Sequence, residues 1–186
     1  TGWGKAVWGK LYGQWIAECG VFVYDYHAKF KPIDLMKQIE KYHITSFCAP
    51  PTIYRFLIQE DLSQFDFSSL EHCTTAGEPL SEEVFNKWKN ITGLSLKEGF
   101  GQTETTLSLL NFGNEKVKPG SIGKSAPYYN VTLLDENGEE VADGEVGEIA
   151  VQLKDGPFPG LFVEYFGDAE KTKSVMHDGW YFTGDN

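Results

Sequence analysis

Apolar positions along this chain follow two periods, and the change from one to the other predicts alternating strands and helices. Residues 1–17 carry apolar side chains at helical spacing, whereas 20–26 is a short β-branched and aromatic run typical of a buried strand. Further strands are predicted at 44–49, 68–76 and 94–97. Helices are predicted from Pro32, after Pro50-Pro51, and from an N-cap at Ser81 to Gly93. This alternation predicts an α/β fold, with a mainly parallel sheet flanked by helices.

After about Asn111 the helix-period segments give way to short strands separated by turn glycines. Residues 131–134 and 146–153 predict a hairpin, Asp168 is placed to cap a short helix, and 180–182 is the last strand. We therefore expect two units, an α/β subdomain over residues 1–112 and a smaller, β-rich and barrel-like subdomain over residues 113–186.

Composition indicates a globular chain with an acidic surface. Of 186 residues, 41% are hydrophobic and 15% aromatic, which is enough to fill a core, and the formal net charge is −11. Such a charge argues against nucleic acid or an anionic membrane as a partner. The chain has no apolar run long enough to span a membrane. Cys19, Cys48 and Cys73 are widely spaced in or beside apolar runs, so we expect buried free thiols and a cytoplasmic location.

Three small-residue turns follow strand-like runs and carry the polar groups typical of a binding site. They are Gly77-Glu78-Pro79, the stretch from Glu98 to Glu104, and Thr183-Gly184-Asp185. Ligands on parallel sheets bind at the carboxyl ends of strands, where the first two of these turns are predicted to lie.

The central turn combines backbone access with chemistry suited to a nucleotide. Gly99 and Gly101 allow close approach of a ligand, and Phe100 between them offers a flat apolar face. Thr103 adds a hydroxyl, and Glu104 adds a hard oxygen ligand of the kind that binds Mg²⁺. Taken alone, the stretch fits a glycine-rich turn capped by Thr and Glu equally well.

The order of the three turns, which read GEP, FGQTE and YFTGD, resembles the adenylate-forming superfamily. The flanking segments TGWGKAVWG, APPTIYR, KPGSIGKSAP and PGLFVEYFGDAEKT are most similar to its acetyl-CoA and medium-chain acyl-CoA synthetase branch. The resemblance covers essentially the whole chain. It implies an ATP-dependent acid–thiol ligase, in which a carboxylic acid and MgATP give acyl-AMP and the thiol of CoA then displaces AMP.

The resemblance also implies roles for individual residues. The turn Gly77-Glu78-Pro79 flanks the adenine, Phe100 stacks on it, and Gln102 and Thr103 reach the base edge and the α-phosphate. Glu104 holds Mg²⁺, with Thr103 and Glu104 as the catalytic pair, and Asp185 accepts hydrogen bonds from the ribose hydroxyls. The remaining nucleotide-binding positions are Glu98, Gly99 and Gly101.

For the acyl group, the resemblance implies a pocket formed by Trp3, Gly4, Ala76 and Gly101. Acetate-specific members of the branch carry Trp at the position of Gly101, and larger residues at those of Gly4 and Ala76. Small residues here indicate a deeper pocket and hence a short-chain or medium-chain fatty acid longer than acetate. A Gly101→Trp change is then expected to shift the preference towards acetate or propionate.

We expect the chain to be an internal piece of a longer enzyme. In the resembled family a phosphate-binding loop precedes residue 1, and a hinge, a ribose-binding Arg and a catalytic lysine follow Asn186. The piece alone is therefore expected to be inactive and prone to self-association through uncovered apolar surface. Two alternatives stay open, an amino-acid or aryl-acid activating enzyme and a non-catalytic nucleotide-binding module. The four His residues lack metal-ligand spacing.

Overall fold

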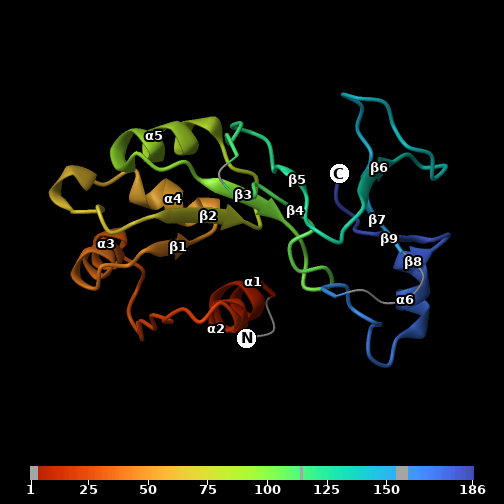
Figure 1. The fold of residues 1–186 in the computed structure, drawn as a ribbon, viewed down its shortest axis with the longest axis horizontal. Coiled ribbons are helices and arrows are strands. Elements are labelled where there is room, and N and C mark those ends of the chain that lie inside the picture. Colours follow the sequence, from red (N-terminus) through yellow and green to blue (C-terminus); the bar gives the residue numbers. More distant parts are fainter. Residues whose placement is uncertain (1–3, 114, 154–158) are drawn as a thin grey trace.

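The computed structural model describes residues 4–113, 115–153 and 159–186, which form two β-sheets with helices packed beside them (Figure 1). The helices are α1 (Gly4–Val7), a π-helical turn (Trp8–Tyr12), α2 (Gly13–Ile16), α3 (Pro32–Lys41), α4 (Pro51–Leu57), a 3₁₀ turn (Leu62–Gln64), α5 (Glu82–Thr92) and α6 (Ala169–Val175). The strands are β1 (Ser46–Cys48), β2 (His72–Ala76), β3 (Lys97–Phe100), β4 (Leu109–Leu110), β5 (Lys124–Ser125), β6 (Val131–Leu134), β7 (Glu148–Gln152), β8 (Met176–His177) and β9 (Trp180–Phe182).

The first sheet has the strand order β1-β2-β3-β4-β5 and is mixed. Strands β1, β2 and β3 are parallel, and β4 and β5 add antiparallel strands to one side. Figure 1 shows α3, α4 and α5 gathered around the parallel strands. The predicted α/β fold with flanking helices is thus confirmed. In the register Ala76 lies opposite Gly99, so β2 and β3 end side by side and bring their two turns together.

Strand β3 begins at Lys97, whereas the pattern predicted a strand over 94–97. Glu98, Gly99 and Phe100 therefore lie in the strand rather than in the turn that follows it. Gly101 to Glu104 form the turn itself.

Aromatic and aliphatic side chains from α3, α4 and α5 fill the core against β1 and β2. Trp88 of α5 and Tyr54 of α4 are fully buried, and their rings meet edge to face with centroids 4.9 Å apart. Met36, Ile39 and Leu96 complete the centre of this cluster. Burying a large apolar side chain contributes about 1.5 to 3 kcal/mol, so these residues anchor the parallel strands that carry the site.

Caps at three helix ends agree with the sequence pattern. The side chain of Ser81 accepts a hydrogen bond from the Val84 amide, and Gly93 ends α5 in the left-handed region with φ of 76°. Asp168 likewise caps α6 by accepting from the Lys171 amide. Each cap satisfies a helix-end group that would otherwise need water.

The second sheet is antiparallel, with the order β6-β7-β9-β8, and contains the predicted hairpin of β6 and β7. It lies with α6 at the other end of the long axis in Figure 1. Closure of this unit into a barrel stays a prediction. So does the division at residue 112, although β5 pairs with β4 and extends the first sheet to Ser125.

Two N-terminal predictions need correction. Residues 20–26 form no strand, and Val23 is 78% exposed. Strand β1 is the edge of the first sheet, but within the described part of the chain this aromatic run does not pair with it, and Phe22 packs against Tyr42 instead. Residues 4–16 are helical as predicted, but Trp15 and Ile16 on their apolar face are exposed.

Among the cysteines Cys73 is buried, Cys48 is partly buried and Cys19 is exposed, so the prediction of three buried thiols is wrong for Cys19. The reason is its place after α2, next to the unpaired 20–26 run rather than beside a core strand. In the described ranges, no helix combines the length and apolar character needed to cross a membrane.

Candidate nucleotide-binding site

The ends of β2 and β3 and the last residues of the chain enclose a pocket of about 420 Å³. Most of its lining was singled out from the sequence: Gly77, Glu78, Pro79, Glu98, Gly99, Phe100, Gly101 and Asp185. Leu80, Gly120, Ile122, Ile149 and Asn186 complete it. Segments more than a hundred residues apart thus meet at one edge of the first sheet, and Ile149 comes from β7 of the second sheet.

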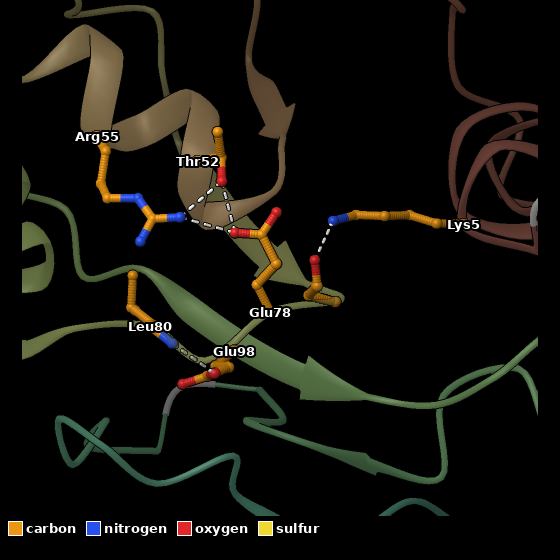
Figure 2. Close-up of polar contacts among 7 residues, drawn as sticks. Lys5, Thr52, Arg55, Glu78, Leu80 and Glu98 are labelled. Carbon is orange, nitrogen blue, oxygen red and sulfur yellow. Dashed lines mark hydrogen bonds and ion pairs between the residues drawn. The ribbon is translucent and has the colours of Figure 1, made fainter. Parts of the chain in front are cut away.

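The turn after β2 is held by polar contacts on both sides (Figure 2). Gly77 has φ of 92°, a conformation that favours glycine. Figure 2 shows the carboxylate of Glu78 facing α4, where it accepts hydrogen bonds from Thr52 at 2.6 Å and Arg55 at 2.9 Å. On the other side Lys5 of α1 donates to the Ala76 carbonyl at 2.5 Å. The turn is therefore fixed before any ligand binds.

Glu98 places a buried carboxyl group in the wall of the pocket. Its side chain is 8% exposed, and Oε1 accepts a 3.1 Å hydrogen bond from the Leu80 amide. Burial raises the pKa of Glu98, because the ionised form loses hydration. Opposite Glu98 in the neighbouring strand lies Thr75, which is also buried.

Gly101 is required by sterics. A Cβ atom at this position would overlap the carbonyl oxygen of Thr106, so any side chain needs the backbone at 106 to move. A Trp cannot simply replace Gly101 in this backbone, which weakens the expectation that Gly101→Trp only alters acyl-chain preference. Gly4 is less restricted, since its Cβ would lie 3.0 Å from the Cα of Thr103.

Two of the remaining proposed nucleotide residues, Gln102 and Glu104, face the second sheet rather than the 420 Å³ pocket. Gln102 and Glu104 line an adjoining cavity of about 600 Å³ together with Tyr165 and Tyr181. Glu104 accepts a 2.8 Å hydrogen bond from the Tyr165 hydroxyl. Thr103 turns towards α1, and its hydroxyl accepts a 3.2 Å hydrogen bond from the Gly4 amide. The turn thus joins the two sheets and the N-terminal helix.

Sequence reasoning missed several residues of this site. Tyr181 belongs to the YFTGD stretch, but the sequence predicts no role for it, and Thr52, Arg55 and Tyr165 lie in the segments that flank the three turns. Their polar tips in otherwise apolar runs are the only local signal, and that signal is weak. Trp3, expected at the acyl group, lies outside the described residues. Among the described residues no three His, Cys, Asp or Glu side chains cluster as a metal site.

Comparison with known proteins gives matches over most or all of this chain. The family described as "AMP-binding enzyme" matches residues 7–162. Over its full length the chain is 46% identical to rat acyl-coenzyme A synthetase ACSM3, mitochondrial, and covers 32% of that protein. It is 41% identical to 4-hydroxybutyrate–CoA ligase 1 of Metallosphaera sedula, of which it covers 33%. The chain thus spans about a third of the length of these relatives.

Solved structures agree with the sequence comparison. The anthranilate CoA ligase AuaEII in complex with anthranoyl-AMP matches 96% of this chain and 34% of its own, with a TM-score of 0.86 and 27% identity. An acyl-CoA synthetase of Brucella canis matches 98% of this chain and 33% of its own, with a TM-score of 0.84. The name of the rat relative places that protein in mitochondria, so a cytoplasmic location of this chain stays a prediction.

Proposed function

This chain belongs to the AMP-binding enzyme family, and we propose that it forms the adenosine-binding part of an ATP-dependent acyl-CoA synthetase. In the proposed reaction a carboxylate oxygen attacks the α-phosphorus of ATP and the bond to pyrophosphate breaks. The thiol of CoA then attacks the acyl carbon of the acyl-AMP, and AMP leaves. Such chemistry depends on positioning and charge neutralisation more than on a protein nucleophile.

One observation carries the proposal: three turns separated in sequence converge on a single pocket of about 420 Å³. Its composition suits a nucleoside. Phe100 offers an aromatic face for the adenine, and the turn Gly77-Glu78-Pro79 lies beside it. The buried carboxyl of Glu98 is an acceptor for a base amine, and Asp185 is an acceptor for ribose hydroxyls.

Glu104 fits the role of a magnesium ligand. Mg²⁺ is commonly bound through one or two carboxylates together with substrate phosphates, and Glu104 supplies one such carboxylate on a fixed turn. When bound, Mg²⁺ would neutralise charge on the phosphates. In this chain the hydroxyl of Tyr165 and the backbone amide of Phe162 hold Glu104 in place, through Oε1 and through its carbonyl oxygen at 2.7 Å.

We assign the acyl group to the side of the site where α1 meets the two turns. Gly4 contacts Thr103 there, and Ala76 is held through Lys5. The proposed substrate is a short-chain or medium-chain fatty acid. The relative at 46% identity is named an acyl-coenzyme A synthetase and another a 4-hydroxybutyrate–CoA ligase, which supports an aliphatic acid, while the structural similarity to an anthranilate CoA ligase makes an aryl acid the second candidate.

The test uses the full-length protein that contains this chain. ATP–pyrophosphate exchange is measured with acetate, butyrate, hexanoate, octanoate and anthranilate, and thioester formation is then measured with CoA. Exchange with butyrate to octanoate and loss of exchange in Asp185→Ala are expected. Exchange with none of these acids, despite a folded protein, would contradict the proposal and favour a non-catalytic nucleotide-binding module.

A further inference from the structure

Among the described residues, the side chain of Gln102 makes three hydrogen bonds, all of them to the last strand and the turn that follows it. Its amide nitrogen Nε2 donates to Oδ2 of Asp185 at 2.7 Å and to the carbonyl oxygen of Thr183 at 2.8 Å. Its oxygen Oε1 accepts from the hydroxyl of Tyr181 at 2.6 Å. A residue of the turn after β3 is thereby bonded to Tyr181 of β9 and to Thr183 and Asp185 just beyond that strand.

These contacts fix the orientation of the Gln102 amide. An amide group has two N–H donors, and both are directed at the acceptors Asp185 and Thr183. Turning the amide over would bring its oxygen against a carboxylate and a carbonyl, which repel it. The hydroxyl of Tyr181 fits the observed orientation as well, because it donates to Oε1.

Tyr181 is a rigid support for this arrangement. Its side chain is 2% exposed, and its ring packs edge to face against Phe162 with centroids 5.5 Å apart. Burial, followed by the nearby charge of Glu104, raises the pKa of Tyr181, so the hydroxyl stays protonated and remains a donor. Tyr181 therefore anchors Gln102, and Gln102 in turn directs one oxygen of Asp185.

We propose that Gln102 is a positioning residue for the Asp185 carboxylate, anchored by Tyr181, and that Gln102 does not read the base edge. The inference rests on the proposed role of Asp185 as the partner of the ribose hydroxyls. With Oδ2 bonded to Gln102, the carboxylate is held ready for the sugar and need not be ordered when the nucleotide binds. The sequence resemblance had instead placed Gln102 at the base edge.

The experiment is isothermal titration of the full-length protein with AMP and with 2′,3′-dideoxy-AMP, without added metal. Gln102→Met and Tyr181→Phe each remove hydrogen bonds while keeping most of the side-chain volume. Each is expected to weaken AMP binding by about tenfold, the effect of one hydrogen bond. Neither is expected to change the affinity for the dideoxy nucleotide. In an Asp185→Ala background Gln102→Met is expected to add nothing, because it acts through Asp185.

Two matched control variants remove the same kinds of hydrogen bond at positions outside the pocket. Gln64→Met removes a glutamine amide that donates to Asp61 at 3.1 Å, and Tyr26→Phe removes a tyrosine hydroxyl that donates to the Lys29 carbonyl at 2.6 Å. Both controls should bind AMP as the wild type does. Thermal unfolding of all variants identifies any that have lost the fold.

The outcomes distinguish a failure of the Gln102 inference from a failure of the proposed function. Equal losses for AMP and dideoxy-AMP in a folded Gln102→Met variant would show that Gln102 contacts the base, and would overturn the inference. Unchanged AMP binding in Gln102→Met, with a clear loss in Asp185→Ala, would also overturn it but leave the ribose role intact. Unchanged AMP binding in Asp185→Ala would remove the ribose role itself, and with it the main support for the proposed function.

Discussion

The hydroxyl of Tyr165 donates a 2.8 Å hydrogen bond to Oε1 of Glu104, 61 residues earlier in the chain. Beside it the Phe162 amide donates to the Glu104 carbonyl oxygen at 2.7 Å. Gln102, two residues before Glu104, is bonded instead to the strand β9 and to Asp185. Glu104 is thus bonded to the segment around Tyr165, and Gln102 to the segment that ends in Asp185. We expect Glu104 and Asp185 to have correspondingly different roles.

We expect Asp185→Ala to weaken AMP and ATP alike, by about 10- to 150-fold, because a charge-assisted hydrogen bond to ribose is worth about 1.5 to 3 kcal/mol. Glu104→Ala should leave AMP binding nearly unchanged and reduce magnesium-dependent turnover. Isothermal titration of both full-length variants with AMP and with ATP, with and without Mg²⁺, measures this. Equal losses of AMP affinity in the two variants would contradict the assignment of Asp185 to the ribose and Glu104 to Mg²⁺.

The meeting of the first two turns could be predicted from the sequence, because each follows a strand of the parallel sheet and carries small and polar residues. Their strands β2 and β3 are adjacent, as the pairing of Ala76 with Gly99 shows. The third turn follows β9 of the second sheet, and only the family resemblance implied its place beside the other two. The partners that fix the turns could not be predicted. Arg55 and Tyr165 are remote from Glu78 and Glu104 in sequence, and a local pattern contains no information on which distant hydroxyl or guanidinium meets which carboxylate.

The N-terminal errors have a similar origin. Residues 20–26 have the composition of a strand, yet a strand also needs a hydrogen-bonded neighbour. In the described structure the free edge of β1 does not pair with this run. Phe22 is exposed and Ile16 is 83% exposed, so apolar periodicity indicates only a tendency of such residues to be buried. It does not identify the surface that buries them.

Glu98→Gln should change stability in a pH-dependent way. The pKa of Glu98 is raised in the folded state, so the folded protein binds this proton more tightly than the unfolded chain does. The stability gained from this tighter proton binding is fully present below the ordinary carboxyl pKa, and it is lost as the pH rises through the raised pKa. Glutamine keeps an acceptor for the Leu80 amide but carries no charge.

We therefore expect Glu98→Gln to be more stable than the wild type at neutral pH and to lose that advantage in acid. Urea denaturation of both full-length proteins across this pH range measures the difference in free energy of unfolding. Glu83→Gln, on the first turn of α5, is the control. A difference that grows as the pH falls would contradict the burial argument.

The thiols should differ in reactivity. Burial raises the pKa of Cys73 to about 11, so about one molecule in a thousand carries the thiolate at pH 8. Cys19 is exposed. Labelling with a chromogenic disulfide reagent at pH 8 should modify Cys19 rapidly, and Cys73 only after denaturant is added. Cys19→Ser and Cys73→Ser variants assign the two phases, and rapid native labelling that survives Cys19→Ser but not Cys73→Ser would contradict the assignment.

Gly101→Ala should destabilise the protein by about 1 to 3 kcal/mol, the usual effect of forcing an atom into a packed site. The new Cβ would overlap the Thr106 carbonyl oxygen, and relief requires movement of the turn that carries Glu104. Gly20→Ala is the control, since its Cβ would meet nothing within 4 Å. Thermal and urea unfolding compare the two variants. A Gly101→Ala protein as stable as the control would mean that the 101–106 turn yields easily, and would restore Gly101 as a site for altering acyl-chain preference.

The 186-residue chain produced alone should fold in part but not catalyse. The cluster around Trp88 and Tyr54 gives it a core, whereas Trp15 and Val23 leave apolar surface that favours self-association. Catalysis should fail because, among the described residues that line the 420 Å³ pocket and the cavity of about 600 Å³ beside Glu104, none is Lys or Arg, while Glu78, Glu98 and Asp185 add negative charge. Charge developing on the phosphates then has no positioned cationic donor, and the loss of even one such donor costs about 10² to 10³ in rate. Size-exclusion chromatography, AMP titration and ATP–pyrophosphate exchange with acetate to octanoate measure the three properties. Exchange above background that disappears in Thr103→Val would show that this chain contains a complete catalytic site.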